Sequence, residues 1–192
     1  MSSEIIGQLV RRAQQGDTSA VEALYQRYAQ SVYRYIYYRV SSTADAEDLT
    51  AEVFVKMVEG LPAYRFTGAP FEAWLYRIAA ARVIDHRRRS KRRPQVELTE
   101  NLADSTMLPE EEIQQAQEIN TLRLALGQFS DEEQTLLILR FVERKSHQEV
   151  ADLMGKSPAA VKSMQHRTLI RLAALLGSDE KVRHYLRGGG QS

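Results

Sequence analysis

The chain has 192 residues, a length that fits one ordinary domain or two small ones and excludes a long catalytic barrel. Its 26 Lys and Arg nearly balance 25 Asp and Glu, so the formal charge of +1 on its own indicates no polyanionic partner. The absence of cysteine excludes disulfides, thiolate zinc sites and cysteine nucleophiles.

The N-terminal sequence MSSEIIGQLVRR places an acid before the apolar residues and bases after them, the reverse of a signal peptide. No apolar stretch approaches the ~18 residues of a membrane span. We therefore expect a soluble, cytoplasmic protein.

Three segments of the N-terminal half carry apolar residues at helical spacing. The first runs from about Ser19 to Arg39. The stripes of the three segments are Val21, Leu24, Tyr25, Tyr28, Val32, Tyr35 and Ile36; Ala46, Leu49, Val53, Phe54 and Met57; and Phe71, Trp74, Leu75, Ile78 and Ile84. Ser19 with Glu22, and Ser42 with Asp45, have the spacing of helix-capping residues. These patterns predict an all-α N-terminal domain over residues 1–93.

The charge is segregated beyond this domain. The stretch from Arg82 to Arg93 holds seven basic residues and one acid, whereas residues 94–121 hold seven acids and no Lys or Arg. Pro94, Pro109 and weak periodicity predict an acidic flexible linker over residues 94–117, because such a segment buries too little apolar area to offset chain entropy. A C-terminal domain over 118–176 and a tail over 177–192 complete the expected organisation.

Helical signals return in the C-terminal domain. Ser130 with Glu133 and Ser146 with Glu149 have capping-box spacing. Gly155 supplies a left-handed turn, and Ser157 precedes a Pro at the first position of the next helix. Two helices joined by so short a turn predict a helix-turn-helix, whose second helix enters the major groove of DNA. The alternative is a plain helical hairpin with a solvated basic face.

Two further clusters carry candidate chemistry. Five aromatic residues lie between Tyr64 and Tyr76, directly before the arginines, and rings beside cations suit unpaired bases. For Phe71, Trp74 and Leu75 the core is the favoured interpretation. The acids Asp45, Glu47, Asp48 and Glu52, with Thr50, indicate a magnesium site, a complement to the helix dipole or a docking face for a basic partner.

Three motifs in order resemble the extracytoplasmic-function sigma factors of bacterial RNA polymerase. They are D-A-E-D-L-T-A-E-V-F (45–54), F-E-A-W-L-Y-R-I-A (71–79) with Asp85 and the arginines, and the helix-turn-helix from Gly155 to Arg167. The resemblance runs from about Gly16 to Leu176. Two positions depart from the family pattern: Met164-Gln165 replaces the usual Arg-Leu, and Ala80-Ala81 stands where Asn is common.

The resemblance implies a non-enzymatic subunit, without cofactor or metal, that binds core RNA polymerase and directs promoter recognition, promoter melting and transcription initiation. Its implied partners are the β′ clamp helices and β flap of the polymerase, promoter DNA as duplex and melted strand, and an anti-sigma factor. The polymerase-binding residues are Asp45, Asp48, Leu49, Glu52, Val53 and Phe54. The minus-ten residues are Tyr64, Phe66, Trp74, Arg77, Arg82, Arg87, Arg88 and Arg89. The minus-thirty-five residues are Lys156, Ser157, Ala159, Ala160, Lys162, Ser163, His166, Arg167 and Arg171.

Two alternative functions stay open at this point. One is a stand-alone helix-turn-helix transcriptional regulator whose N-terminal bundle senses a ligand or dimerises. The other is a metal-dependent nuclease that uses the Asp45 cluster.

Overall fold

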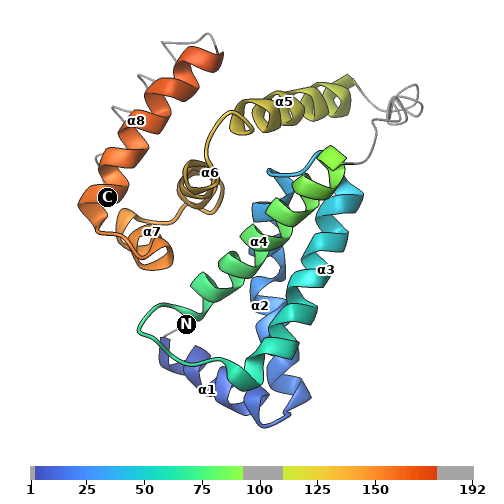
Figure 1. Cartoon of the computed structure of the whole chain (residues 1–192), viewed down its shortest axis with the longest axis vertical. Helices are drawn as coiled ribbons and strands as arrows, with labels where there is room; N and C mark the ends of the chain where they lie inside the picture. Colours follow the sequence, from blue (N-terminus) through green and yellow to red (C-terminus); the bar gives the residue numbers. More distant parts are fainter. Residues whose placement is uncertain (1–2, 93–109, 177–192) are drawn as a thin grey trace.

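The computed structural model describes residues 3–92 and 110–176, and every regular element within these ranges is helical (Figure 1). The elements are α1 (Ser3–Gln14), α2 (Thr18–Tyr37), α3 (Thr43–Gly60), the 3-10 turn η1 (Leu61–Ala63), α4 (Phe71–Arg92), α5 (Glu110–Leu126), α6 (Asp131–Leu137), the π-helical turn η3 (Ile138–Val142), α7 (His147–Met154) and α8 (Pro158–Leu176). The all-α fold class is confirmed.

The predicted linker and tail fall mainly outside the described residues. Positions 93–109 and 177–192 are not described, whereas α5 begins at Glu110 and covers the last part of the segment 94–117. The domain boundaries proposed from the sequence stay a prediction.

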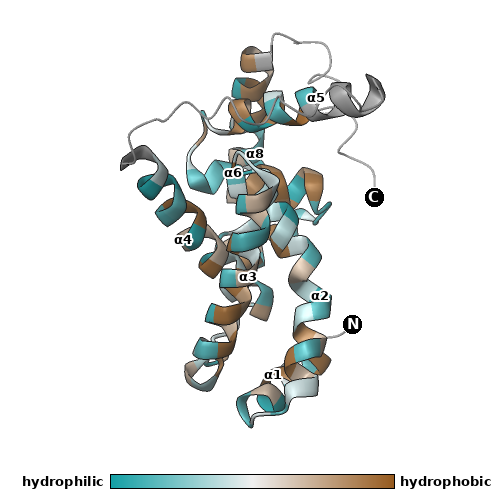
Figure 2. Ribbon diagram, turned by 90° about the vertical axis from the view of Figure 1, so that its right-hand side faces the viewer, coloured by the Kyte–Doolittle hydropathy of each residue, from teal (hydrophilic) through white to brown (hydrophobic). Residues whose placement is uncertain are grey.

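Helices α2, α3 and α4 pack side by side, and α1 packs against the N-terminal half of α2 (Figure 1). Figure 2 shows apolar positions interleaved with polar ones along these helices, as amphipathic packing requires. Leu24, Met57 and Leu75 are fully buried at the centre. The sequence reasoning missed α1, although Val10 is also fully buried. Its signal was an apolar spacing of four and three residues, at Ile6, Val10 and Ala13.

The helix starts follow local side-chain chemistry, with one correction to the sequence prediction. Ser42 caps α3 as expected and accepts a hydrogen bond from the backbone N of Asp45. The prediction that Ser19 caps α2 was wrong. Asp17 caps this helix, and its side chain accepts hydrogen bonds from the backbone N atoms of Ser19 and Ala20. A carboxylate also complements the positive end of the helix dipole, which a serine hydroxyl does not.

The helix-turn-helix forms as its local signals predict. Both capping boxes, Ser130 with Glu133 and Ser146 with Glu149, are present at the starts of α6 and α7. Gly155 ends α7 with φ of 65° and ψ of 37°, in the left-handed region that residues with a Cβ resist. The hydroxyl of Ser157 then accepts from the backbone N of Ala160 at the start of α8.

The two halves of the chain share one hydrophobic core cluster, which joins residues of α1–α4 to residues of α6, η3, α7 and α8. Polar contacts cross the same boundary. The buried Arg39 donates to Gln134 and Asp131, and the hydroxyls of Tyr35 and Thr135 lie 2.8 Å apart. The described structure is therefore a closed arrangement of the two halves.

Candidate functional site

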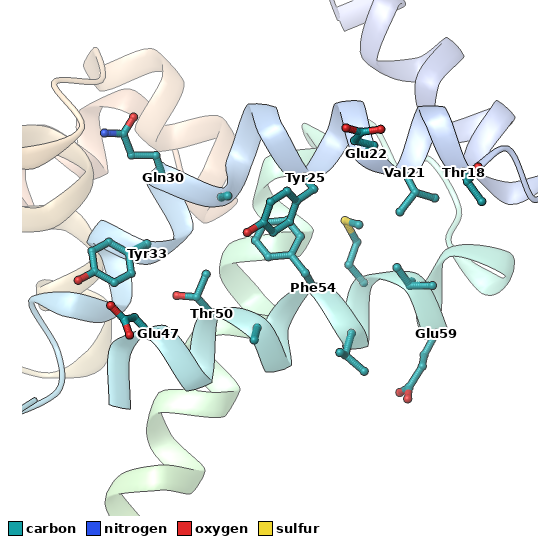
Figure 3. A pocket seen from close by; sticks show the side chains of 15 residues that line it. Thr18, Val21, Glu22, Tyr25, Gln30, Tyr33, Glu47, Thr50, Phe54 and Glu59 are labelled. Atoms are coloured by element: carbon teal, nitrogen blue, oxygen red, sulfur yellow. The ribbon is translucent and has the colours of Figure 1, made fainter. Parts of the chain in front are cut away.

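An apolar groove of about 960 Å³ runs between α2 and α3 (Figure 3). At its centre the rings of Tyr25 and Phe54 pack edge to face with centroids 4.8 Å apart. Tyr25, Val55 and Val58 are about half exposed. Exposed apolar side chains gathered in one groove are typical of a surface that binds another protein.

The rim of this groove is acidic. Glu22, Glu47 and Glu59 are the only charged residues among the fifteen that line it, and Figure 3 shows Glu47 and Glu59 near its opposite ends. Asp48 and Glu52 are exposed on the neighbouring face of α3. The combination of apolar floor and acidic rim suits a partner with both apolar and basic side chains.

The structure divides the six predicted polymerase-binding residues into two groups. Asp48 and Glu52 are exposed, and the carboxylate of Asp45 lies 3.6 Å from Nε2 of His86. Leu49 and Val53 are buried in the core, and Phe54 is largely buried beneath Tyr25. In this arrangement Leu49 and Val53 fix the position of α3 rather than forming its outer surface.

The sequence reasoning missed the exposed apolar part of the groove. It assigned Tyr25 to the core stripe of its helix, and it did not single out Val55 and Val58. A helix that packs on one side only carries polar residues beside its core stripe. The apolar residues beside the core stripe of α3 were therefore the available signal for a second contact surface.

An aromatic platform lies at one end of the bundle, formed by Tyr64, Phe66, Phe71 and Trp74. The Tyr64 ring contacts the other three, with centroid distances of 5.3 Å to Phe66, 5.3 Å to Phe71 and 4.8 Å to Trp74. Phe71 is buried, Trp74 is partly buried and Phe66 is half exposed. Burial raises the pKa of the Tyr64 hydroxyl, so this side chain stays neutral near pH 7.

The predicted minus-ten arginines of α4 differ in accessibility. Arg77, Arg88 and Arg89 are exposed. Arg82 pairs with Asp85 on its own helix at 2.9 Å. Arg87 is hydrogen-bonded at the contact between the two halves of the chain.

Arg87 donates to the carboxylate of Asp131, the side-chain oxygen of Gln134 and the carbonyl of Arg39. Burial and the nearby charge of Arg39 lower its pKa. Arg87 reaches DNA only if this contact opens.

The outer face of α8 presents most of the predicted minus-thirty-five residues. Those with exposed side chains are Ser157, Ala159, Ala160, Lys162, Ser163, His166, Arg167 and Arg171. Two of the predicted cations are ion-paired to α6: the half-buried Lys156 to Glu132 at 2.8 Å and the exposed Arg171 to Glu133 at 2.6 Å. Lys162 and Arg167 are thus the exposed cations of this set that form no ion pair within the described part of the chain.

The departure at Met164-Gln165 has a structural explanation. Met164 is partly buried and packs against the shared core. The side-chain oxygen of Gln165 accepts from Nε of Arg140 at 2.8 Å. Both residues therefore stabilise the orientation of α8 on the domain.

Comparison with known proteins identifies the family. Sigma-70 region 2 matches residues 24–93, which contain most of the groove and the aromatic platform, and Sigma-70 region 4 matches residues 119–172, which contain the helix-turn-helix. The ECF RNA polymerase sigma factor BldN of Streptomyces coelicolor is 37% identical over 176 residues, covering 91% of this chain and 67% of BldN. The chain belongs to the extracytoplasmic-function (ECF) sigma factors.

Two further comparisons agree with this assignment. The ECF RNA polymerase sigma factor ShbA of Streptomyces griseus is 34% identical to this sigma factor over 182 residues, covering 89% of this chain and 95% of ShbA. The solved structure of CnrH in complex with the cytosolic domain of CnrY has the same fold, with a TM-score of 0.65, 21% identity and coverage of 90% of this chain and 97% of CnrH. The ECF sigma factor described here therefore binds core RNA polymerase and promoter DNA and acts in transcription initiation.

Two observations concern the described residues alone. None of their helices is both long enough and apolar enough to cross a membrane. Within residues 3–92 and 110–176, no three His, Asp or Glu side chains converge as a metal-binding group, and this holds at Asp45, Asp48 and Glu52.

Proposed function

We propose that the groove between α2 and α3, with the acidic face of α3, is the surface on which this sigma factor seats on the β′ clamp helices of core polymerase. The observation that carries the proposal is the exposed apolar groove of Tyr25, Val55 and Val58 with acids around it. Apolar contact supplies affinity, and the carboxylates supply register and rate of association with a basic partner.

Charge reversal on α3 tests this docking surface. The double variant Asp48→Lys with Glu52→Lys should abolish core binding in a pull-down and abolish transcription, while far-UV circular dichroism stays unchanged. Both residues are exposed, so the fold tolerates the change. A matched control reverses two exposed acids elsewhere, Glu4 on α1 and Asp152 on α7, and should retain core binding. Unchanged core binding in the first variant would show the assignment to be wrong.

We further propose that the aromatic platform and α4 capture the melted minus-ten strand. The rings of Tyr64 and Phe66, which pack edge to face, and the exposed Arg77, Arg88 and Arg89 support this role, because unpaired bases stack on rings and phosphates bind cations. The test is permanganate reactivity of unpaired thymines in a promoter fragment that wild-type holoenzyme transcribes. Phe66→Ala should lower this reactivity without lowering core binding. Equal reactivity would exclude Phe66 from strand capture.

The N-terminus of α8 is proposed to read the minus-thirty-five element as duplex. Small side chains at Ala159, Ala160 and Ser163 permit close approach to base edges, and Lys162 and Arg167 reach the phosphates. Arg167→Ala should lower the slope of log affinity against log salt by about 1 for the holoenzyme. Arg11→Ala, which removes an exposed arginine of α1, should leave the slope unchanged.

The remaining parts of the proposal concern partners, chemistry and place of action. The exposed Leu124 of α5 and Ile170 of α8 support a contact between the C-terminal half and the β flap. The groove also suits an anti-sigma factor, which would compete with the polymerase for it. We propose that this sigma factor is cytoplasmic and has no catalytic activity of its own. Run-off transcription with core enzyme and genomic fragments of the encoding organism tests the function as a whole.

A further inference from the structure

The loop that carries Tyr64 and Phe66 is tied to α1 by one side chain. Gln14 is the last residue of α1, and its amide nitrogen Nε2 donates to the carbonyl oxygens of Leu61 and Tyr64, both at 2.9 Å. A side-chain amide has two N–H donors, so the two bonds use its full donor capacity. The backbone leading into the aromatic platform is thereby fixed to a helix that the family match to residues 24–93 does not include.

A second contact fixes the position of Trp74 in the aromatic platform. A Cβ atom added at Gly60 would lie 2.9 Å from Cζ2 and 3.3 Å from Cη2 of Trp74. The backbone of Gly60 has φ of −87° and ψ of −16°, which any residue adopts. Glycine is therefore required here by the close approach of the indole ring and not by the backbone conformation.

These two contacts meet at the same cluster of rings. Gln14 holds the carbonyl of Tyr64, Gly60 makes room for Trp74, and the Tyr64 and Trp74 rings contact each other at a tilted angle of 44° with centroids 4.8 Å apart. A platform that is ordered before binding spares the entropy cost of ordering a loop around each base. Both contacts therefore favour strand capture without either residue touching DNA.

We propose that Gln14 and Gly60 are positioning residues for capture of the melted strand. Gln14 sets the path of the loop that bears Tyr64 and Phe66, and Gly60 lets Trp74 lie against the end of α3 beneath the Tyr64 ring. The proposal rests on the proposed role of this platform in binding unpaired bases. It adds α1, outside the matched regions, to the machinery of promoter melting.

Trp74 is the sole tryptophan, so intrinsic fluorescence of the full chain reports on the platform directly. Gln14→Ala should raise the acrylamide quenching constant about twofold as the loop opens. Gln14→Glu, which keeps the length of the side chain but cannot donate at neutral pH, should behave like Gln14→Ala. Gln15→Ala removes an exposed side chain of the same type at the next position and should match wild type.

The glycine is tested in the same way. Gly60→Ala should shift the Trp74 emission and its quenching, because the new methyl group displaces the indole. Gly7→Ala is the control, since a Cβ there meets only the flexible end of Arg11, at 3.5 Å. Circular dichroism and a urea unfolding curve confirm that each variant is folded.

Promoter opening supplies the functional measurement. With core polymerase and a promoter fragment that wild type transcribes, Gln14→Ala, Gln14→Glu and Gly60→Ala should each lower open-complex thymine reactivity by about tenfold. Core binding should be unchanged in all three. The Gln15→Ala and Gly7→Ala controls should open the promoter as wild type does.

The outcomes separate this inference from the proposed function. Wild-type quenching and opening in Gln14→Glu would overturn the role of the two donated hydrogen bonds. Altered quenching with undiminished opening would show that the platform is positioned by these residues but is not used in capture, which also overturns the inference. If wild type itself opened no promoter, the proposed function would fail, while the fluorescence comparison would still decide whether Gln14 and Gly60 position the platform.

Discussion

Replacing Arg34 by Met is expected to destabilise the fold more than replacing Glu143 by Gln, because the two ends of this ion pair differ in burial. Nε and Nη2 of Arg34 donate to the two carboxylate oxygens of Glu143 at 2.7 and 2.8 Å. The Glu143 side chain is only 6% exposed, whereas that of Arg34 is 35% exposed. Loss of the guanidinium thus leaves a nearly buried carboxylate without its cation, whereas loss of the carboxylate leaves a cation that water reaches.

The magnitudes follow from this asymmetry. Breaking a buried pair costs about 3–5 kcal/mol, and residual solvent access places Arg34→Met near the lower end, at about 3 kcal/mol. Glu143→Gln should cost about 1 kcal/mol, because a partly exposed guanidinium is rehydrated. The coupling energy of the pair, from a double-mutant cycle, should be about 1.5–2 kcal/mol.

Urea unfolding followed by circular dichroism gives the free energies of unfolding of wild type, both single variants and the double variant. The pair between Lys56 and Glu59 on α3 is the control, since both side chains are more than half exposed. Its coupling energy should be no more than about 0.5 kcal/mol. Equal costs for the two single variants, or a coupling no larger than that of the control pair, would refute the reasoning from burial.

Three further predictions concern other parts of the fold. Hydrogen bonds from Ser19 and Arg12 lower the pKa of Asp17 from its ordinary 3.8 to about 2, so its stabilising contribution is complete above pH 3.8 and is lost as the pH falls through about 2. The urea midpoint of Asp17→Ala should accordingly lie below that of wild type at pH 5 and approach it near pH 2. Gly155→Ala should destabilise the fold by about 1–2 kcal/mol, because alanine resists a φ of 65°, and should weaken duplex binding; a wild-type urea midpoint would contradict this. Thr168→Val should raise the unfolding free energy by about 1 kcal/mol, because the fully buried hydroxyl has no hydrogen-bond partner among the described residues; a lower midpoint would count against it.

The closed arrangement of the two halves links stability to function. The contact between them holds Arg87, a predicted minus-ten residue, against Asp131 and Gln134. Lys145 of the C-terminal half also pairs with Glu72 at the start of α4, at 3.0 Å. On the proposed minus-ten role of Arg87, this contact has to open when DNA binds, so its strength sets a free-energy cost for DNA binding by the free chain.

Local signals in the sequence predicted what depends on neighbouring residues. The serines of both capping boxes, Gly155 and the apolar spacing of three helices act over a few positions, and the structure has these caps, this turn and the three helices where they were expected. The wrong prediction of the α2 cap is also a local error. Asp17 and Ser19 are two residues apart, and both are residue types that cap helices. The three motifs that resemble ECF sigma factors could be recognised for the same reason, because each is a short stretch of chain.

By itself, the sequence determined the helical class, the helix-turn-helix and the family, because periodicity and capping are properties of a short stretch of chain. Only the tertiary structure decided which apolar residues stay exposed, as Tyr25 and Val55 do, and which arginines are free, since burial depends on what packs opposite. It alone joined Gln14 to a carbonyl 50 residues away. Such contacts are set by how helices pack in three dimensions, and the spacing of residues within one helix carries no record of them.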